Sequence, residues 1–382
     1  MKKTLKMGMI GGGLGSFIGD VHRKAAAMDG MIDLVCGAFS STAEKSKESA
    51  KVLGIKEDRA YANFEEMIQR EQQLPEAEKM DIVAVVTPNY MHFTPVKMAL
   101  EHGFHVICDK PLCITVSEAK ELEQVIKKSG KVFALTHNYT GYPMVKQAKA
   151  MIENGDLGDI RKVMVQYIQG WLATSVEKDG QKQAAWRVDP KRSGIGGALG
   201  DIGTHAENLT SYMTGLTIKE LAADLTAFGE GRALDDDGNI LLRFENGAKG
   251  TLAFSQIATG EENNLAIRVY GTKGSLFWQQ ENPNELFVKW LNQPHQIYTP
   301  GGNGLDPEVA EYVRIPAGHP EGYLEGFATI YKDFAKEVIR VESGKPISQS
   351  FKFPSINEGI AGMNFIYKVV ESSKNNASWV QL

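Results

Sequence analysis

The sequence predicts an α/β protein with a doubly wound parallel sheet, followed by an α+β domain with mostly antiparallel strands. The first third of the chain alternates short apolar runs with stretches that carry helix-capping residues. Beyond about residue 140, neighbouring apolar runs are joined by tight turns, as in antiparallel hairpins. The length of 382 residues exceeds the ~100–200 of a typical domain, so we expect two domains, 1–138 and 139–382.

Repeated strand–helix–strand units account for the N-terminal part. Segment 81–87 is almost entirely apolar, as a strand buried on both faces must be. Thr94-Pro95 predicts the start of a helix and Gly103 its end, while Thr115 and Glu118 have the spacing of a capping box. The expected strands are 5–10, 32–39, 81–87, 105–108 and 131–136. One expected helix includes residues 25–27, and the others are 42–53, 94–103 and 115–128.

Antiparallel pairs dominate the C-terminal part. The turn Asn246-Gly247 separates two alternating runs, and a Gly-Thr-Lys-Gly turn separates two more, which predicts two hairpins. Segment 292–320 is rich in proline, glycine and polar residues and is expected to be a long loop. The expected strands are 161–169, 240–244, 250–254, 265–270 and 275–278, and the expected helices are 142–154, 323–340 and 355–372.

Composition excludes several classes of protein. Hydrophobic residues make up 42% and charged residues 23% of the chain, which excludes disordered and fibrous proteins. The 42 Lys and Arg against 47 Asp and Glu give a net charge of -5, so no general basic field for nucleic acid or an anionic membrane is expected. The apolar runs are too short for a membrane helix or a signal peptide, and three cysteines cannot form a disulfide framework. We therefore expect a cytoplasmic protein.

A glycine-rich loop, 10–19, lies between the first expected strand and the first expected helix. Residues without side chains let the backbone turn tightly and approach a pyrophosphate, which the helix N-terminus attracts. Gly11 and Gly13 fit the dinucleotide-binding spacing, whereas Ser16 occupies the third glycine position and Gly19 is placed to provide close helix packing. The alternative is a glycine-rich turn that binds no ligand. The candidate cofactor contacts here are Gly11, Gly13, Leu14 and Gly15.

The residue that ends the second strand is expected to meet the adenosine ribose of the cofactor. An acidic residue is common there in NAD sites, whereas this chain has Ser40 followed by Ser41. A serine hydroxyl can bond a ribose hydroxyl or a 2′-phosphate, and no arginine follows directly. NAD and NADP therefore both stay open, and these serines could also simply cap the next helix.

Lys110 follows the expected strand 105–108, and the carboxyl ends of parallel strands face the ligand crevice of such a sheet. A lysine at that edge can polarise a hydroxyl or carbonyl oxygen. The alternative is an ordinary surface lysine in a loop.

Asp201 and His205 are four residues apart, so a helix would place both on one face. A histidine held by a carboxylate can act as a base near neutral pH. The alternatives are a structural histidine and a metal site. Because neither an H-x-x-x-H motif nor a cysteine pair supplies further ligands, no metal is predicted.

Taken in order, these motifs resemble the Gfo/Idh/MocA family of oxidoreductases over almost the whole chain. The family usually has glutamate where this chain has Asp109, and both acids accept hydrogen bonds. Residues 15–19, 38–41 and Trp186-Arg187 are similar to the branch that contains levoglucosan dehydrogenase and the glucoside 3-dehydrogenases. The motifs that carry the resemblance are the glycine loop, Thr87-Pro88-Asn89 with His92, Asp109-Lys110-Pro111, 155–158 and 200–205.

The resemblance implies a Rossmann domain that binds NAD, with NADP possible, and a second domain with a large, mostly antiparallel open sheet. It implies that a sugar binds in the cleft between the domains, and that the protein is a homodimer or homotetramer. Its catalytic residues would be Lys110, Asp201 and His205. The other cofactor contacts would be Ser40, Ser41, Thr87, Pro88, Asn89, His92, Asp109 and Lys110.

Five further residues are candidate substrate contacts, because aromatic rings suit the apolar face of a sugar and arginine suits its hydroxyls. Each of them could instead belong to the core or the surface. They are His137, Tyr139, Trp186, Arg187 and His319.

Hydride transfer between NAD(P) and a sugar, glycoside or polyol is the activity that the resemblance implies. His205 would remove the hydroxyl proton, Lys110 would stabilise the alkoxide, and Asp201 would orient the substrate or the histidine. Two other functions stay open: an NAD-dependent glycosidase that oxidises C3 transiently, and a non-catalytic dinucleotide-binding sensor. The intact catalytic set argues against the sensor.

Overall fold

The computed structural model describes residues 4–178 and 180–382, and its contacts divide the chain into two compact units. The first unit contains the residues up to Asn138 together with Leu324–Ile360. The second contains Tyr139–Tyr323 and Ala361–Leu382. Residues 324–360, expected in the second domain, belong to the first unit in the structure.

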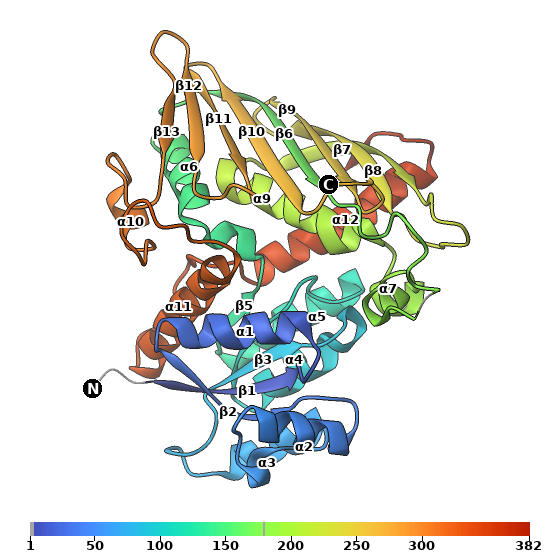
Figure 1. Cartoon of the computed structure of the whole chain (residues 1–382), viewed down its shortest axis with the longest axis vertical. Helices are drawn as coiled ribbons and strands as arrows, with labels where there is room; N and C mark the ends of the chain where they lie inside the picture. The colour runs from blue at the N-terminus through green and yellow to red at the C-terminus, as the bar shows by residue number, and fades with distance from the viewer. Residues whose placement is uncertain (1–3, 179) are drawn as a thin grey trace. The chain divides into compact units, whose positions relative to one another are not determined.

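The first unit is built on a parallel sheet in the order β2-β1-β3-β4-β5 (Figure 1). In β1, Met9 pairs with Gly37 on one side and with Ala84 on the other, so the strand order reverses at β1. Every residue of β3 is buried, as in a strand covered by helices on both faces. The predicted doubly wound parallel sheet is confirmed. Its strands are β1 (Leu5–Gly11), β2 (Ile32–Ala38), β3 (Ile82–Val86), β4 (His105–Cys108) and β5 (Phe133–Leu135).

Helices cover both faces of this sheet. Parallel crossovers are right-handed, and the chain moves in opposite directions from β1 to β2 and from β3 to β4, so the first helix lies on the opposite face from the two that follow β3 and β4. The first helix also contacts the helix that returns from the C-terminal part, since His22 Nδ1 lies 2.7 Å from the hydroxyl of Tyr331. The helices of this unit are α1 (Phe17–Met28), α2 (Ala43–Val52), α3 (Phe64–Gln73), α4 (Phe93–Glu101), α5 (Val116–Ser129) and α11 (Tyr323–Glu342).

Local sequence signals account for the start of α5 but not for that of α4. Thr115 and Glu118 form the predicted capping box of α5. The predicted start of α4 at Thr94 is wrong, because the helix begins at Phe93 with His92 as its N-cap. A 3₁₀ turn, Asn89–Met91, runs directly into α4 and leaves Thr94 inside the first helical turn.

The second unit is built on a sheet in the order β13-β12-β11-β10-β6-β9-β8-β7-β14. Its pairs are antiparallel except for β6 with β9, which confirms the predicted large, mostly antiparallel sheet. Both predicted hairpins form, β8 with β9 and β10 with β11. The strands are β6 (Ile160–Ile168), β7 (Ile218–Thr226), β8 (Asp237–Phe244), β9 (Lys249–Ser255), β10 (Asn264–Gly271), β11 (Gly274–Gln279), β12 (Leu286–Trp290), β13 (Gln296–Tyr298) and β14 (Val380–Gln381).

Helices α6 and α9 pack together against one face of this sheet (Figure 1). The C-terminal helix is tied to β7, since the hydroxyl of Ser372 accepts a hydrogen bond from the backbone N–H of Ala223 at 2.9 Å. Segment 292–320, expected to be a loop, contains β13 and a short helix. The helices are α6 (Pro143–Glu153), α7 (Lys182–Arg187), α8 (Pro190–Ser193), α9 (Thr204–Thr214), α10 (Pro307–Ala310) and α12 (Ile356–Lys374), with a π-helical turn at Leu199–Gly203.

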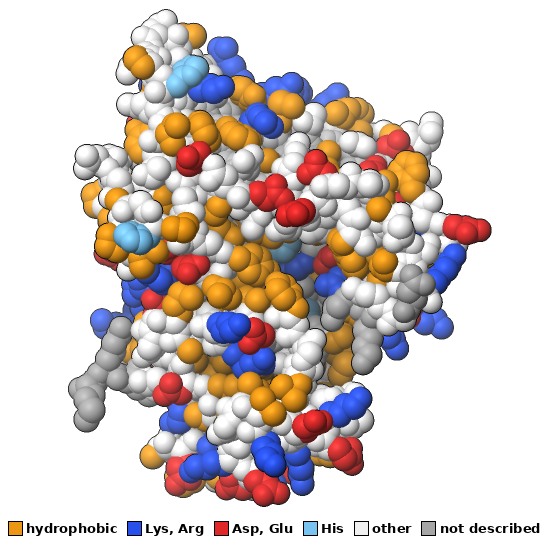
Figure 2. Space-filling model, in the orientation of Figure 1, with side chains coloured by type: hydrophobic (Ala, Val, Ile, Leu, Met, Phe, Trp, Pro, Cys, Tyr) orange, Lys and Arg blue, Asp and Glu red, His pale blue; other side chains and the backbone are white. Residues whose placement is uncertain are grey.

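The surface shows no single charged field on the face drawn in Figure 2, where lysine and arginine are interspersed with aspartate and glutamate. Within residues 4–178 and 180–382, no helix is both long enough and apolar enough to cross a membrane. The same residues contain no cluster of three or more His, Cys, Asp or Glu arranged to hold a metal ion.

Candidate active site

The glycine loop begins where β1 ends and is shaped by backbone that only glycine adopts easily. Gly11 and Gly12 have φ angles of 80° and 68°, in the left-handed region. The hydroxyl of Ser16 then caps α1 by accepting a hydrogen bond from the N–H of Gly19 at 3.1 Å. The loop therefore turns sharply and delivers the chain into a helix N-terminus, where an anion is favoured.

Close backbone approach also requires glycine at the start of α1. A Cβ atom built on Gly19 would lie 2.4 Å from the Cα of Gly12, and one built on Gly13 would lie 2.6 Å from the carbonyl oxygen of Phe39. The packing role expected for Gly19 is confirmed. Because side chains are excluded on this side, the loop forms a backbone cradle that fits a dinucleotide pyrophosphate.

We expect Gly19→Ala to disrupt this cradle. The added methyl group meets backbone, which cannot rotate away, so a loss of about 1–3 kcal/mol in stability is expected, together with weaker dinucleotide binding. Urea unfolding and an NADH titration measure the two effects. Gly362→Ala in α12 is the matched control, because its Cβ would meet nothing within 4 Å. That helical substitution should stabilise by about 0.5–1 kcal/mol, and an unchanged Gly19→Ala protein would contradict the cradle.

The two serines after β2 do not cap the next helix. Thr42 is the N-cap of α2, and its hydroxyl accepts a hydrogen bond from the N–H of Lys45. The alternative that Ser40 and Ser41 serve only as caps is therefore wrong. Ser40 is half-buried and Ser41 is exposed, so both lie in an accessible loop at the carboxyl edge of the sheet.

Asp109 and Lys110 directly follow β4, at the same carboxyl edge as the glycine loop. Asp109 Oδ1 accepts hydrogen bonds from the hydroxyl of Thr136 at 2.9 Å and from the N–H of Lys110 at 2.8 Å, which orients this loop. His137 follows β5 and is buried. Burial, assisted by the charge of Lys110, lowers the pKa of His137 to about 3, so its imidazole stays neutral under ordinary conditions.

His92 holds two of the strand-end loops together. Its Nε2 lies 2.8 Å from the carbonyl oxygen of Thr87, and its Nδ1 lies 2.7 Å from that of Pro111. The side chain has no exposed surface, and Asn89 beside it is 5% exposed. Of the predicted cofactor contacts in this region, Thr87 and Pro88 are thus more accessible than His92. The buried imidazole of His92 instead holds their loop in place.

His22 is a residue of this edge that the sequence analysis missed. It is fully buried in α1, and its Nε2 lies 4.0 Å from Asp109 Oδ2. Burial lowers the pKa of His22, which the nearby Asp109 partly opposes. No local pattern marks this residue, since its neighbours come from α11 and from the loop after β4.

Asp201 and His205 lie in the second unit, but the helix between them is not regular. Asp201 belongs to the π-helical turn Leu199–Gly203, and His205 is the second residue of α9. The four-residue spacing between them therefore spans a π-helical turn and the start of α9. Asp201 Oδ2 accepts hydrogen bonds from Arg187 Nε at 3.1 Å and from Gln256 Nε2 at 2.8 Å.

His205 is 8% exposed and packs among aromatic rings. Its ring lies edge-on to Tyr139, with centroids 4.8 Å apart, and 6.1 Å from the ring of Tyr167. The hydroxyls of Tyr139 and Tyr167 are 2.5 Å apart. Burial raises the pKa of Tyr139, so its phenol stays protonated at neutral pH.

The remaining predicted substrate contacts fall into two groups. The guanidinium of Arg187 lies 4.3 Å from the centre of a Trp186 ring, and 5.9 Å from that of Trp171. This places an arginine and two indoles beside Asp201. His319, by contrast, lies in an exposed turn, and its ring Nδ1 is 3.1 Å from the carbonyl oxygen of Pro316 in the same turn.

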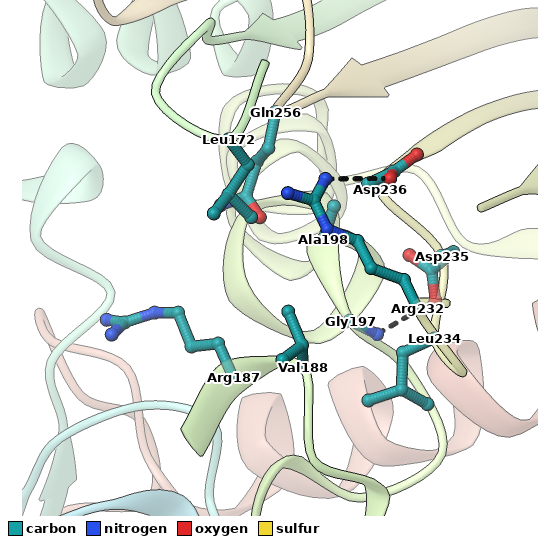
Figure 3. A pocket seen from close by; sticks show the side chains of 10 residues that line it. All are labelled: Leu172, Arg187, Val188, Gly197, Ala198, Arg232, Leu234, Asp235, Asp236 and Gln256. Carbon is teal, nitrogen blue, oxygen red and sulfur yellow. Dashed lines mark hydrogen bonds and ion pairs between the residues drawn. The ribbon is translucent and has the colours of Figure 1, made fainter. Parts of the chain in front are cut away.

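Arg187 also lines a pocket in the second unit (Figure 3). Asp235 on the opposite side accepts hydrogen bonds from the N–H groups of Gly197 and Leu199 at 2.8 and 2.7 Å, which anchors the turn that carries Asp201. Burial raises the pKa of Asp235 to about 6. No sequence pattern marks Asp235 or Gln256, because their partners are distant in sequence.

Comparison with known proteins gives matches over nearly the whole chain. A model described as an oxidoreductase family with an NAD-binding Rossmann fold matches residues 5–137, and one described as a GFO/IDH/MocA C-terminal domain matches residues 145–277. An uncharacterized oxidoreductase, YfiI, of Bacillus subtilis is 36% identical over 100% of this chain and 98% of its own length. Levoglucosan dehydrogenase of Pseudarthrobacter phenanthrenivorans is 28% identical over 91% of this chain and 92% of its own.

Solved structures are similar over the same extent. The crystal structure of an inositol dehydrogenase homologue from Azotobacter vinelandii with NAD+ has a TM-score of 0.95 and 35% identity, covering 100% of this chain and 98% of that one. Levoglucosan dehydrogenase in complex with NADH and levoglucosan has a TM-score of 0.83 and 27% identity, covering 99% of both chains.

Proposed function

The chain belongs to the Gfo/Idh/MocA family of oxidoreductases, and from this membership we propose that it is an NAD-dependent dehydrogenase of a sugar or polyol. The names of its relatives support the substrate class, since inositol and levoglucosan are both neutral polyhydroxyl compounds. The proposed reaction oxidises a carbinol to a ketone and is reversible. The same groups would reduce a keto sugar in the other direction.

One observation carries the proposal: Lys110 and the glycine cradle lie at the same edge of one parallel sheet. The cradle would hold the pyrophosphate at Gly11, Gly13 and Gly15, and the loops after β2 and β3 would hold the rest of the cofactor. Bound NAD would supply the hydride acceptor. A lysine at that edge is suited to stabilise negative charge on a substrate oxygen.

We assign the proton transfer to His205 and the stabilisation of the alkoxide to Lys110. The neutral imidazole of His205 accepts the hydroxyl proton, and the ammonium of Lys110 donates a hydrogen bond to the oxygen that becomes negative. Asp201 accepts a hydrogen bond from the substrate or orients the histidine. Arg187 and the indole of Trp186 contact the remainder of the sugar.

Steady-state turnover tests this proposal against its two alternatives. A dehydrogenase consumes added NAD in proportion to product, whereas a glycosidase that oxidises C3 transiently turns over without added NAD, and a sensor does not turn over. A screen of glycosides, anhydrosugars and inositols with NAD and NADP therefore separates the three. Turnover of a glycoside without added cofactor would replace the dehydrogenase with the glycosidase.

We expect the protein to prefer NAD(H) to NADP(H). Ser40 is accessible at the end of β2 and is not directly followed by an arginine that could bind a 2′-phosphate. Fluorescence titration of the folded protein with NADH and NADPH measures the preference. Binding of NADPH at least about tenfold tighter than NADH, about 1.4 kcal/mol, would overturn the assignment.

We further propose a cytoplasmic homodimer or homotetramer. Met164, Leu241 and Tyr270 on three strands of the second sheet are 37%, 52% and 38% exposed, and apolar residues on a sheet face support association between copies. Light scattering in solution tests this proposal, and a monomer at micromolar concentration would contradict it.

A further inference from the structure

We propose that Gln256 is a positioning residue for the oxidoreductase reaction and acts by holding Asp201. This inference rests on the role proposed for Asp201 above. Gln256 follows β9 and is 1% exposed, and its Nε2 lies 2.8 Å from Asp201 Oδ2 and 3.3 Å from Gln169 Oε1. Its backbone is held on both sides, because its N–H donates to the carbonyl of Asp236 and its carbonyl accepts from the N–H of Leu172, each at 2.8 Å.

The orientation of the Gln256 amide follows from an indole. The Nε1–H of Trp171 can only donate, and it points to Gln169 Oε1 at 3.2 Å. That atom must therefore be an oxygen acceptor. The end of Gln256 that faces both this oxygen and the carboxylate of Asp201 meets two acceptors, so it must be the NH₂ group. Trp171 and Gln169 thus determine that Gln256 presents a donor to Asp201.

The same chain of donors reaches the tyrosines beside His205. Because the amide oxygen of Gln169 accepts the hydrogen bond from Trp171, its Nε2 group donates to Asn263 Oδ1 at 2.8 Å. The hydroxyl of Tyr167 donates to the same oxygen at 2.8 Å, so it must accept the proton of Tyr139. Tyr139 therefore keeps its phenolic proton, directed at Tyr167, and only accepts hydrogen bonds from other partners. It is a poor candidate for the base because its oxygen stays protonated.

Two donors, Arg187 and Gln256, bind the same oxygen of Asp201, Oδ2, but they differ in how firmly they are held. Arg187 is 23% exposed on its side chain and belongs to a short helix, whereas Gln256 is buried next to the central strands. The amide is therefore the rigid partner, and it keeps the carboxylate in place when the arginine moves toward a substrate hydroxyl.

Gln256→Glu tests the donor directly, since it keeps the shape and replaces the NH₂ group with an acceptor. Two carboxylates at this distance favour a shared proton, although the guanidinium of Arg187 on Asp201 partly offsets their repulsion. Loss of that proton at higher pH leaves two negative charges facing each other. We expect kcat of the variant to be at least about tenfold below that of the wild type and to fall as the pH is raised, the opposite of the slope expected for oxidation with a general base. The affinity for NADH should stay within about twofold.

Gln296→Glu is the matched control, because it makes the same change of amide to carboxyl at a residue on an exposed edge strand, where Gln296 accepts a hydrogen bond from the indole of Trp290 at 2.7 Å. It should keep the wild-type profile. If Gln256→Glu does not fold, Gln256→Ala should show the loss of kcat without the inverted pH slope. A wild-type rate and profile in the folded Gln256 variant, with Asp201→Asn inactive, would overturn the positioning role. A fully active Asp201→Asn protein would instead remove Asp201 from the proposed mechanism.

Discussion

His205→Asn should slow substrate oxidation by a factor of about 10²–10⁴, the usual contribution of a positioned acid or base. Asparagine keeps roughly the size of the imidazole and one hydrogen bond but cannot take up a proton. The rest of the site leaves no ready substitute. The phenol of Tyr139 has a raised pKa and donates its proton to Tyr167, so it stays protonated at neutral pH.

The pH profile distinguishes a base from a structural histidine. Oxidation by the wild type should fall toward acid pH as the imidazole of His205 becomes charged and can no longer accept a proton. His137 does not contribute this limb, because burial and Lys110 lower its pKa to about 3. The variant should lose the acid limb together with the rate.

The measurement is kcat against pH on folded wild type, His205→Asn and a control, His295→Asn. His295 lies in an exposed loop of the same unit, so its replacement should leave the profile unchanged. A purely structural His205 would lower the yield of folded protein but leave its activity per folded molecule intact. If the folded variant keeps both its rate and its acid limb, His205 is not the base.

Lys110→Ala should reduce kcat by about 10²–10³-fold, the effect of removing one preorganised donor to a developing oxyanion. The affinity for NADH should change little, because the pyrophosphate is expected to bind the backbone of the glycine loop and not this side chain. Removal of the cation also raises the pKa of His137 from its value of about 3, but burial is the larger cause and keeps that imidazole neutral.

Turnover and an NADH titration on the same preparation give the two quantities. Lys127→Ala is a suitable control, since Lys127 is an exposed residue of α5 whose partner is Glu123 one turn away. Loss of NADH binding in parallel with kcat would place Lys110 in cofactor binding alone. A wild-type rate in Lys110→Ala would remove it from the mechanism.

The features that could be predicted from the sequence are those that depend on neighbours along the chain. The apolar run of β3 predicted a strand buried on both faces, and the Thr115–Glu118 spacing predicted the start of α5. The glycines of the first loop predicted backbone that other residues adopt with strain. These properties follow from periodicity, capping and conformational freedom, which act over a few residues.

The distant residues that support the site became apparent only in the folded chain. Gln256 meets Asp201 across 55 positions of sequence, and His22 meets Tyr331 across 309. The π-helical turn at Leu199–Gly203 likewise forms against Asp235, which accepts hydrogen bonds from the N–H of Leu199 and from that of Gly197 just before the turn. Such partners are chosen by sheet order and by the return of α11 to the first unit. Hydrogen bonds and packing depend on proximity in space. Partners that are far apart along the chain therefore cannot be predicted from a local sequence pattern.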